Sequence, residues 1–384
     1  MDYGLEMLNF DYISREIENN LKQKKRSNRA EVLFGPRQVG KSTLLAHIME
    51  NQQTHLLTGD DENDVKILSD PSTYLPLLKD YPNLVIDEAQ YIPSIGRVIK
   101  RMVDNNETNC HIFVTGSSSL DLAGGVMESA AGRINTYSLW PFSLRELAKN
   151  SSWLEVKRSL TERMIYGCYP TVVNEPQYAR EYLRDFVSSV LYKDLFNLAE
   201  MRKPTDLRKL VTYLAYNVGS EIKYVTVSNE LGISAKTIER YVDLLQSCFI
   251  VRVVPSFSRN PQSEIKLGKK IYFIDNGIRN ALISGGFNPF ASRPDTGSLW
   301  ENLFFTERLK KHSYSKDGTE IYFWRTRFLQ EMDFVEVTDG KMKAFECKVT
   351  PRIRGKSVRA FKNAYPECPV TVASPENIEE LDGI

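Results

Sequence analysis

Short apolar runs alternate with helical repeats of apolar residues through the first 140 positions of the chain. The repeats place apolar residues every three or four positions, as at Leu44, Leu45 and Ile48, which is the spacing of one helix face. The strand-like runs are Glu31–Phe34, Thr54–Asp61, Asn83–Glu88, His111–Ser117 and Arg133–Leu139. This alternation predicts an α/β fold, in which a parallel sheet carries helices on both faces.

Beyond residue 140 the apolar pattern becomes mainly helical. Helical repeats cover Leu144–Leu147, Trp153–Tyr166 and Tyr178–Phe196. From Leu207 the chain offers a helix, a short helix over Val225–Gly232, a longer helix that begins at the capping residue Ser234, and a strand over Phe249–Val254. That order is typical of a winged helix-turn-helix, which we place at residues 204–274.

The last part of the chain, residues 275–384, combines one long helix with several strands. An amphipathic helix covers Gly297–Lys311, and strand-like runs follow at Ile321–Arg325, Glu331–Val337 and Lys341–Val349. Asp339-Gly340 joins the last two runs and is the strongest signal for a two-residue hairpin turn. This segment is therefore expected to be an α+β domain.

Composition limits the classes of partner and compartment. A net charge of +1 argues against a uniformly basic nucleic-acid coat, so any basic surface must be local. The five cysteines form no C-x-x-C pair, which favours neither a disulfide framework nor a zinc site and fits a reducing cytoplasm. No apolar run reaches the length of a membrane span, and we expect a cytoplasmic protein with no membrane partner.

The strongest motif lies between the first strand and the helix that follows it. It reads G-x-x-x-x-G-K-S, the phosphate-binding loop of proteins that bind nucleoside triphosphates. Its backbone N–H groups would surround the phosphates, Lys41 would lie between the outer phosphates, and the Ser42 hydroxyl would complete the shell of a magnesium ion. The predicted nucleotide-binding residues are Gly35, Pro36, Arg37, Gln38, Val39, Gly40, Lys41, Ser42 and Thr43.

Two acids complete the predicted nucleotide site. The run Asn83–Glu88 delivers Asp87 and Glu88 to its carboxyl end, where parallel sheets bind ligands. We expect Asp87 to hold Mg²⁺ and Glu88 to orient and deprotonate the attacking water. Ser117 follows another strand and could contact the outer phosphate or that water, with a plain loop serine as the alternative reading.

These segments, together with Gly132-Arg133 and Leu139–Ser143, resemble the AAA-type ATPases of bacteria and archaea. The likeness is to members with a C-terminal domain of unknown function, and it covers nearly the whole chain. It implies an ATPase core at residues 1–145 with a helical lid at 146–203, and a strand between the one with the phosphate loop and the one with the acids. It also implies Ser117 as a sensor and Arg133 as an arginine acting on a nucleotide of its own or a neighbouring subunit in a homo-oligomer.

The winged-helix segment carries the residues that would meet duplex DNA. Lys236 and Arg240 are expected to face outward from the recognition helix. The basic residues assigned to the wing are Arg259, Lys266, Lys269 and Lys270. Such modules bind DNA in many proteins, but exposed Lys and Arg are also the ordinary solvated face of a small domain.

The terminal hairpin brings acids together. With the turn at Asp339-Gly340, Asp333 falls opposite Glu346, and Lys348 lies on the same face. An acid on a helix, Glu301, then D, then E-x-K resembles the PD-(D/E)XK nuclease fold, although Met332 stands where that pattern has proline.

That resemblance implies a second cation site at Asp333, Glu346 and Glu301, with Lys348 beside it. Oxygen ligands would suit magnesium or manganese. The alternative is that Lys348, Arg325 or Arg327 pairs with the acids and no metal enters.

The functional prediction is an ATP-binding, Mg²⁺-dependent ATPase that couples hydrolysis to a DNA-associated task, with DNA cleavage left open. The alternative is a nucleotide-controlled switch whose winged helix and nuclease-like domain hold protein partners without cleavage.

Overall fold

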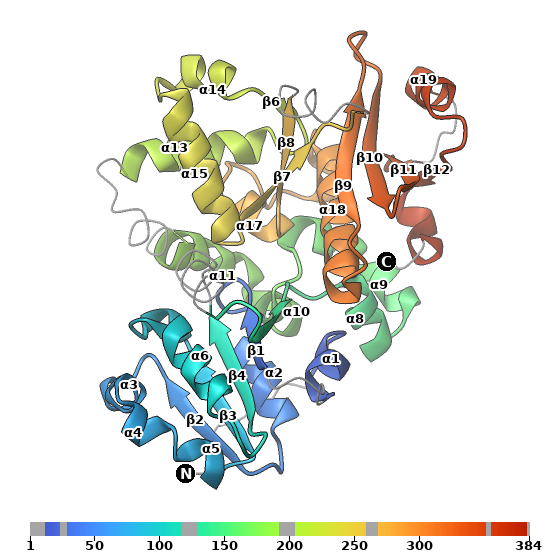
Figure 1. Cartoon of the computed structure of the whole chain (residues 1–384). Coiled ribbons are helices and arrows are strands. Elements are labelled where there is room, and N and C mark those ends of the chain that lie inside the picture. Colours follow the sequence, from blue (N-terminus) through green and yellow to red (C-terminus); the bar gives the residue numbers. More distant parts are fainter. Residues whose placement is uncertain are drawn as a thin grey trace. The chain divides into compact units, whose positions relative to one another are not determined.

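The computed structural model describes residues 12–23, 29–116, 130–191, 204–258, 268–350 and 355–381 (Figure 1). The chain divides into two compact units. The N-terminal unit contains residues 1–140 with 247–249, and the C-terminal unit contains residues 141–246 with 250–384. The first boundary lies close to the expected position at 145, but the three later segments expected as separate bodies fall into one unit.

The N-terminal unit is built on a parallel sheet with strand order β2-β3-β4-β1-β5. Its strands are β1 (Ala30–Phe34), β2 (Thr54–Thr58), β3 (Asn83–Asp87), β4 (His111–Gly116) and β5 (Ile134–Ser138). Every residue of β1 is buried, as expected for a central parallel strand. The expected α/β fold is confirmed, and β4 separates the strand of the phosphate loop from the strand of the acids.

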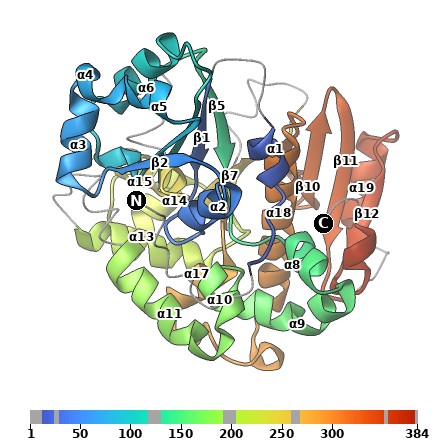
Figure 2. The same ribbon diagram turned by 90° about the horizontal axis from the view of Figure 1, so that it is seen from below.

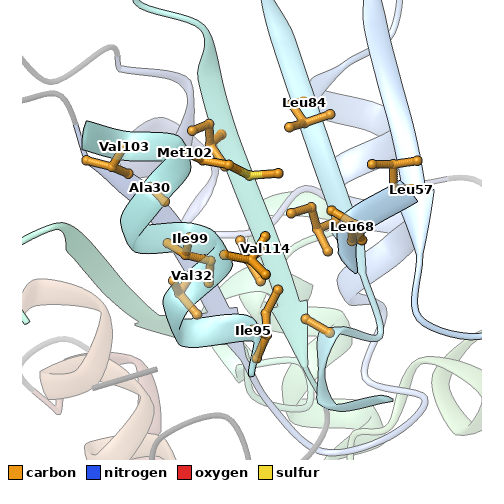
Figure 3. Packing of buried hydrophobic residues seen from close by; sticks show 14 of the residues in the cluster. Ala30, Val32, Leu57, Leu68, Leu84, Ile95, Ile99, Met102, Val103 and Val114 are labelled. Atoms are coloured by element: carbon orange, nitrogen blue, oxygen red, sulfur yellow. The ribbon is translucent and has the colours of Figure 1, made fainter. Parts of the chain in front are cut away.

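Helices cover this sheet and close its core. They are α1 (Glu18–Lys22), α2 (Lys41–Ile48), α3 (Glu62–Ser69), α4 (Pro71–Tyr74), α5 (Leu77–Asp80), the short η1 (Ala89–Tyr91) and α6 (Ile95–Asp104). Figure 3 shows Ile99 and Met102 of α6 against Val32 and Val114 of the sheet, and all four are buried. The apolar stripe of α6 therefore fixes this helix on one sheet face.

The C-terminal unit begins with the helices that we expected to form a lid. They are α8 (Leu144–Asn150), α9 (Trp153–Tyr166), α10 (Pro170–Asn174), η2 (Pro176–Tyr178), α11 (Ala179–Asp185) and the π-helical η3 (Phe186–Leu191). Ser143 begins α8 with a capping box to Glu146, which satisfies two backbone donors at this helix end.

Buried hydrogen bonds join these helices to the last part of the chain. Asp275 accepts from the Cys168 backbone N–H at 2.7 Å, and Glu307 accepts from the Leu144 N–H at 2.8 Å. Lys310 donates to the Phe142 carbonyl at 2.9 Å. Asp275 therefore ties the segment that begins at the expected boundary to the expected lid, and the boundary at residue 275 stays a prediction.

Residues 204–273 contain the three predicted helices and the predicted strand in the predicted order, together with two strands that were not predicted. They form α13 (Pro204–Tyr216), β6 (Glu221–Ile222), α14 (Tyr224–Leu231), α15 (Ala235–Ser247), β7 (Val251–Pro255) and β8 (Lys269–Phe273). The strands make an antiparallel sheet in the order β6-β8-β7. Ser234 accepts from the Thr237 N–H at 3.2 Å, which confirms its capping role at the start of α15.

The last segment pairs a long helix with a mixed sheet. Its elements are α17 (Asn276–Ala281), η4 (Phe290–Ser292), α18 (Thr296–Ser315), β9 (Glu320–Arg325), β10 (Glu331–Thr338), β11 (Lys341–Cys347), α19 (Lys356–Ala364), β12 (Val370–Ala373) and η5 (Pro375–Glu380). The strand order is β12-β11-β10-β9, with β12 parallel to β11 and the other pairs antiparallel. Figures 1 and 2 show α18 alongside β10.

The hairpin between β10 and β11 has the predicted turn and register. Asp339 and Gly340 both have positive φ, 49° and 77°, as a tight hairpin turn requires. Thr338 pairs with Lys341, and Phe334 pairs with Phe345. None of the helices in the described ranges has the length and apolar content needed to cross a bilayer.

Candidate functional site

The loop between β1 and α2 has the backbone of a phosphate cradle. Gly40 adopts a left-handed conformation (φ 92°) directly before the first residue of α2, which an L side chain would resist. A Cβ atom on Gly35 would lie 2.4 Å from the Leu139 carbonyl oxygen. Glycine is therefore required at both positions, and the N–H groups that begin α2 are turned toward the loop.

Lys41 and Ser42 leave this loop in position to meet a triphosphate. The buried Lys41 Nζ donates to the carbonyls of Gly35 and Pro36 at 3.1 and 3.0 Å. The Ser42 hydroxyl donates to Asp87 Oδ2 at 2.8 Å. The predicted ligands of Mg²⁺, Ser42 and Asp87, are thus brought together from α2 and β3, and an all-oxygen pair is the donor type that Mg²⁺ prefers.

The second acid, Glu88, has a strained backbone and a side-chain partner. Its φ of 47° lies in the left-handed region, which is costly for a residue other than glycine. Its N–H donates to Asp87 Oδ1 at 3.1 Å, and Gln90 donates to its carboxylate. The turn after β3 therefore gives the Glu88 side chain a direction different from that of Asp87.

Two supporting residues were not predicted from the sequence. Thr115, at the end of β4, donates to Asp87 Oδ1 and so fixes the carboxylate from the neighbouring strand. Arg15 is buried and donates to the Val39 carbonyl at 3.1 Å and to the Trp140 carbonyl. A polar residue at the end of a buried strand could have revealed Thr115, whereas Arg15 lies outside every motif.

Arg133 lies at the amino end of the parallel strands, whereas the phosphate loop lies at their carboxyl end. The Arg133 carbonyl accepts from the N–H of Ala30, at the amino end of β1, while the loop follows the carboxyl end. Its exposed side chain pairs with Asp104 at 2.5 Å, and this contact raises the pKa of Arg133. Action on the nucleotide of its own subunit does not fit this placement. Ser117 lies outside the described residues.

The comparisons with known proteins agree with this geometry. Residues 27–148 match a family described as AAA domain. They form an AAA-type P-loop domain. This AAA domain is followed by residues 157–288 and 296–383, which match two families that are each described as a domain of unknown function.

Relatives that match most of the chain are found in bacteria and archaea. An uncharacterised protein of Mycobacterium tuberculosis is 28% identical over 326 residues, 83% of this chain and 70% of the relative. One of Methanocaldococcus jannaschii is 23% identical over 378 residues, 92% of this chain and 81% of the relative. A solved Walker-type ATPase of Pyrococcus abyssi shares the fold with a TM-score of 0.50 at 13% identity, over 71% of this chain and 96% of that chain.

Outside the AAA domain, the predicted carboxylates of the terminal sheet do lie close together. Asp333 accepts from the Cys347 N–H at 2.7 Å, next to Glu346 on the paired strand. Burial raises the pKa of Asp333 well above its ordinary value, and the Glu301 and Glu346 carboxylates raise it further. Lys348 pairs with Glu346 at 2.7 Å.

A lysine that was assigned to the wing changes the chemistry of this cluster. Lys270 is 1% exposed, and its Nζ lies 3.0 Å from Glu301 Oε1 and pairs with Glu331. Burial alone would lower the pKa of Lys270, but the carboxylates of Glu301, Asp333 and Glu331 raise it. Tyr272 donates a second hydrogen bond to Glu301 at 2.6 Å.

The cation site predicted at Asp333, Glu346 and Glu301 stays a prediction, and in this structure Glu301 and Glu346 each pair with a lysine. In the part of the chain that the structure describes, no three acidic, histidine or cysteine side chains are grouped to hold a metal ion. The physical reason is that lysines neutralise the acids, Lys270 at Glu301 and Lys348 at Glu346. The predicted pairing of Lys348 with the acids is confirmed, whereas Arg325 pairs with Glu221 and Glu331.

The basic residues predicted to face DNA are only partly on the surface. Lys236 and Arg240 are exposed on α15, as expected. Lys269 is half-buried, with its Nζ 5.0 Å from the Tyr224 ring centre. The assignment of Lys270 to the wing surface is wrong because its ammonium is buried among acids. Arg259 and Lys266 lie outside the described residues.

Proposed function

We propose that the AAA domain binds ATP with Mg²⁺ and hydrolyses it. The observation that carries this proposal is the hydrogen-bonded set of Ser42, Asp87 and Thr115 beside the loop that holds Lys41. Ser42 and Asp87 would hold the ion, which neutralises charge on the outer phosphates when bound. Lys41 would exchange its carbonyl partners for phosphate oxygens.

Glu88 is the proposed general base. A carboxylate in hydrogen-bonding reach of water can accept its proton during attack on the outer phosphate. Gln90 is proposed to position Glu88, since its amide donates to that carboxylate. Thr115 acts through Asp87 and not on the nucleotide.

The experiment that tests hydrolysis compares the wild-type chain with Glu88→Gln. Turnover should require Mg²⁺ and fall roughly 10²- to 10⁴-fold in Glu88→Gln, because the base is lost. Binding of a fluorescent ATP analogue should persist, since the charge-neutralising groups remain. Full turnover in Glu88→Gln would reject Glu88 as the base.

Arg133 is proposed to act between subunits of a homo-oligomer. Its exposed guanidinium lies far from the phosphate loop of its own chain, so a neighbouring subunit would have to supply the nucleotide that it contacts. Arginines of this kind stabilise the charge of the transition state. Ser117, which follows the last residue of β4 in the sequence, keeps its proposed role as the sensor residue.

The C-terminal unit is proposed to perform a DNA-associated task under control of the nucleotide. Support comes from the helix and strand order of residues 204–273, which is that of a winged helix-turn-helix. Exposed Lys236 and Arg240 on α15 would meet the phosphates. The order α18, β9, β10, β11, α19, β12 supports a nuclease-like fold for the terminal module.

A second candidate is a nucleotide-controlled switch that holds a protein partner. The observation that favours it is the charge of the exposed face of α15, where Glu239 and Asp243 stand beside Lys236 and Arg240. Two acids and two bases give this face no net charge. Phosphate binding depends on net positive charge, whereas alternating charges suit a protein surface.

A gel-shift titration of duplex DNA separates the two candidates. If the unit binds DNA, ATP and Mg²⁺ should change the shift, and Lys236→Ala with Arg240→Ala should weaken it and reduce its salt dependence. Glu239→Gln on the same face is the matched control and should strengthen binding. If no duplex is shifted at low salt, the switch with a protein partner replaces the DNA-associated task.

A further inference from the structure

We propose that the Lys270 ammonium takes the place of a divalent cation among the terminal carboxylates, so that this module works without metal and does not cleave DNA. The proposal rests on the nuclease-like fold proposed for residues 296–381 and not on the DNA-associated task. It begins from the contacts of a single side chain that reaches the cluster from β8, in the neighbouring three-stranded sheet.

The Lys270 ammonium is surrounded by carboxylates and an aromatic ring. Its Nζ lies 3.0 Å from Glu301 Oε1, pairs with Glu331, and lies 5.5 Å from the ring centre of Phe323. Carboxylate oxygens and an aromatic face are the groups that stabilise a positive charge away from water. The side chain of Lys270 is only 2% exposed, while those of Glu301 and Glu331 are 17% and 26% exposed. Removing the ammonium would therefore leave two half-buried acids uncompensated.

The remaining acids are also held by groups of the protein. Asp333 accepts from the Cys347 N–H, and Tyr272 shares Glu301 with Lys270. Glu346 uses one oxygen for Lys348, while its buried Oε2 has no hydrogen-bond partner within the described residues. The acids are therefore oriented by an ammonium, a phenol and backbone groups.

The spacing of the oxygens suits an ammonium better than a metal ion. Charge-assisted N–H···O contacts are about 2.7–2.9 Å long, whereas Mg²⁺ takes oxygens at about 2.0–2.1 Å. The contact to Glu301, at 3.0 Å, is close to the first distance and far from the second. Carboxylates spaced to fit an ammonium lie too far apart for three of them to bind one metal ion. In the described part of the chain, no such group of three is found.

A consequence of this arrangement is a joint between two modules. Lys270 belongs to β8, while Glu301 belongs to α18 and Glu331 to β10. Arg325 of β9 makes a second such link to Glu221 of β6, at 2.7 Å. In the proposed arrangement, carboxylates that would bind a metal ion in a metal-dependent nuclease instead form ion pairs between the winged-helix sheet and the terminal sheet.

The test is metal rescue of Lys270→Ala in the full chain. All proteins carry Asp87→Ala and are measured without nucleotide, so that the AAA domain contributes no metal response. Lys270→Ala should lower Tm by on the order of 10 °C, since it takes a buried ammonium away from two half-buried carboxylates. Millimolar MnCl2 should recover at least half of that loss, because the acids can then close on a metal ion.

Three comparisons make the outcome decisive. MnCl2 should not shift the Tm of the parent protein, nor that of Lys269→Ala, the half-buried neighbour. The rescue should disappear when Asp333→Ala is added to Lys270→Ala. If Lys270→Ala does not fold, Lys270→Gln, which keeps a hydrogen-bond donor, is measured in its place against the same criteria.

Two results would overturn the proposal. One is heat of Mn²⁺ binding to the parent protein that vanishes in Asp333→Ala, together with plasmid cleavage that vanishes in Lys348→Ala. The other is a Lys270 variant that Mn²⁺ does not stabilise. Neither result bears on the gel shift of duplex DNA, so failure of this inference is distinguishable from failure of the DNA-associated task.

Discussion

The nucleotide site of the AAA domain and the carboxylate cluster of the C-terminal unit use the same residue types in opposite ways. In the first, Lys41 donates to main-chain carbonyls and Asp87 accepts from hydroxyl groups. In the second, Lys270 is paired directly with Glu301 and Glu331. Charges held by neutral groups can still bind a charged ligand, whereas charges that neutralise each other cannot, and removing one of them leaves the other uncompensated.

Lys41→Ala should have the largest effect on ATP binding, and with it on turnover, without changing the fold. Removing the ammonium leaves the phosphates of ATP without their main protein charge, so ATP affinity should fall by at least about 100-fold. Titration with a fluorescent ATP analogue measures it, and the far-UV spectrum should match that of the wild type. If Lys41→Ala binds ATP with wild-type affinity, the lysine of the phosphate loop is not available to a ligand in the way proposed here.

Arg133→Ala should lower turnover by roughly a thousandfold in the assembled protein, the effect of losing an arginine finger. The matched control is Asp104→Ala, which removes the same surface ion pair but keeps the arginine. Mixing Arg133→Ala subunits with Lys41→Ala subunits should restore part of the activity, because only the latter can donate the arginine. If Arg133→Ala and Asp104→Ala hydrolyse ATP at the same rate, Arg133 has a structural role only.

Glu336→Gln should destabilise the C-terminal unit and leave ATP turnover unchanged. Arg308 reaches Glu336 at 2.6 and 2.7 Å. Although burial opposes it, hydrogen bonding to Arg308 and His312 lowers the pKa of Glu336 from 4.5 to about 2. The loss should be roughly 3 kcal/mol in unfolding free energy at pH 7.

The pH dependence of this effect has a defined sign. Because the folded pKa is depressed, the stabilisation is complete above about pH 5 and is lost as pH falls from 4.5 toward 2. The difference between wild type and Glu336→Gln in urea unfolding should shrink over that window. Glu320→Gln, at an exposed position of the same sheet, should show no such dependence. A constant difference across the window would contradict the assignment.

Arg15→Ala should have the smallest effect. Its guanidinium anchors the phosphate loop through the Val39 carbonyl but belongs to no binding motif, so the loop should loosen without losing a ligand. ATP affinity should fall about tenfold, in line with the loss of a charged hydrogen bond. Arg97→Ala on the exposed face of α6 serves as the control, and an equal loss there would make the effect nonspecific.

The sequence predicted the parts of both regions that depend on local pattern. The phosphate loop, Asp87 and Glu88 follow from strand ends, and the turn at Asp339-Gly340 predicts that Asp333 meets Glu346. Lys270 could not be placed in this way, since its partner Glu301 lies 31 residues further along the chain. A lysine in an apolar strand is a signal for a buried ion pair, but the pattern does not name the partner.

Domain boundaries were the other point where local pattern was insufficient. Asp275 looks like the start of a new segment, and it does begin α17 by accepting from the Gly277 N–H at 2.8 Å. The same carboxylate also accepts from the Cys168 N–H. Gly167 has no room for a side chain, because a Cβ there would lie 1.9 Å from Asp275 Oδ1. Such long-range closure depends on tertiary packing.

The position of Lys270 on β8 bears on how this protein can be dissected. A truncation at residue 275 would separate Glu301, Glu331 and Asp333 from the ammonium that neutralises two of them. The isolated fragment would then present excess negative charge and acquire affinity for cations from the buffer. Metal binding by such a fragment would be an artefact of the cut, so cation studies require a protein that retains β8.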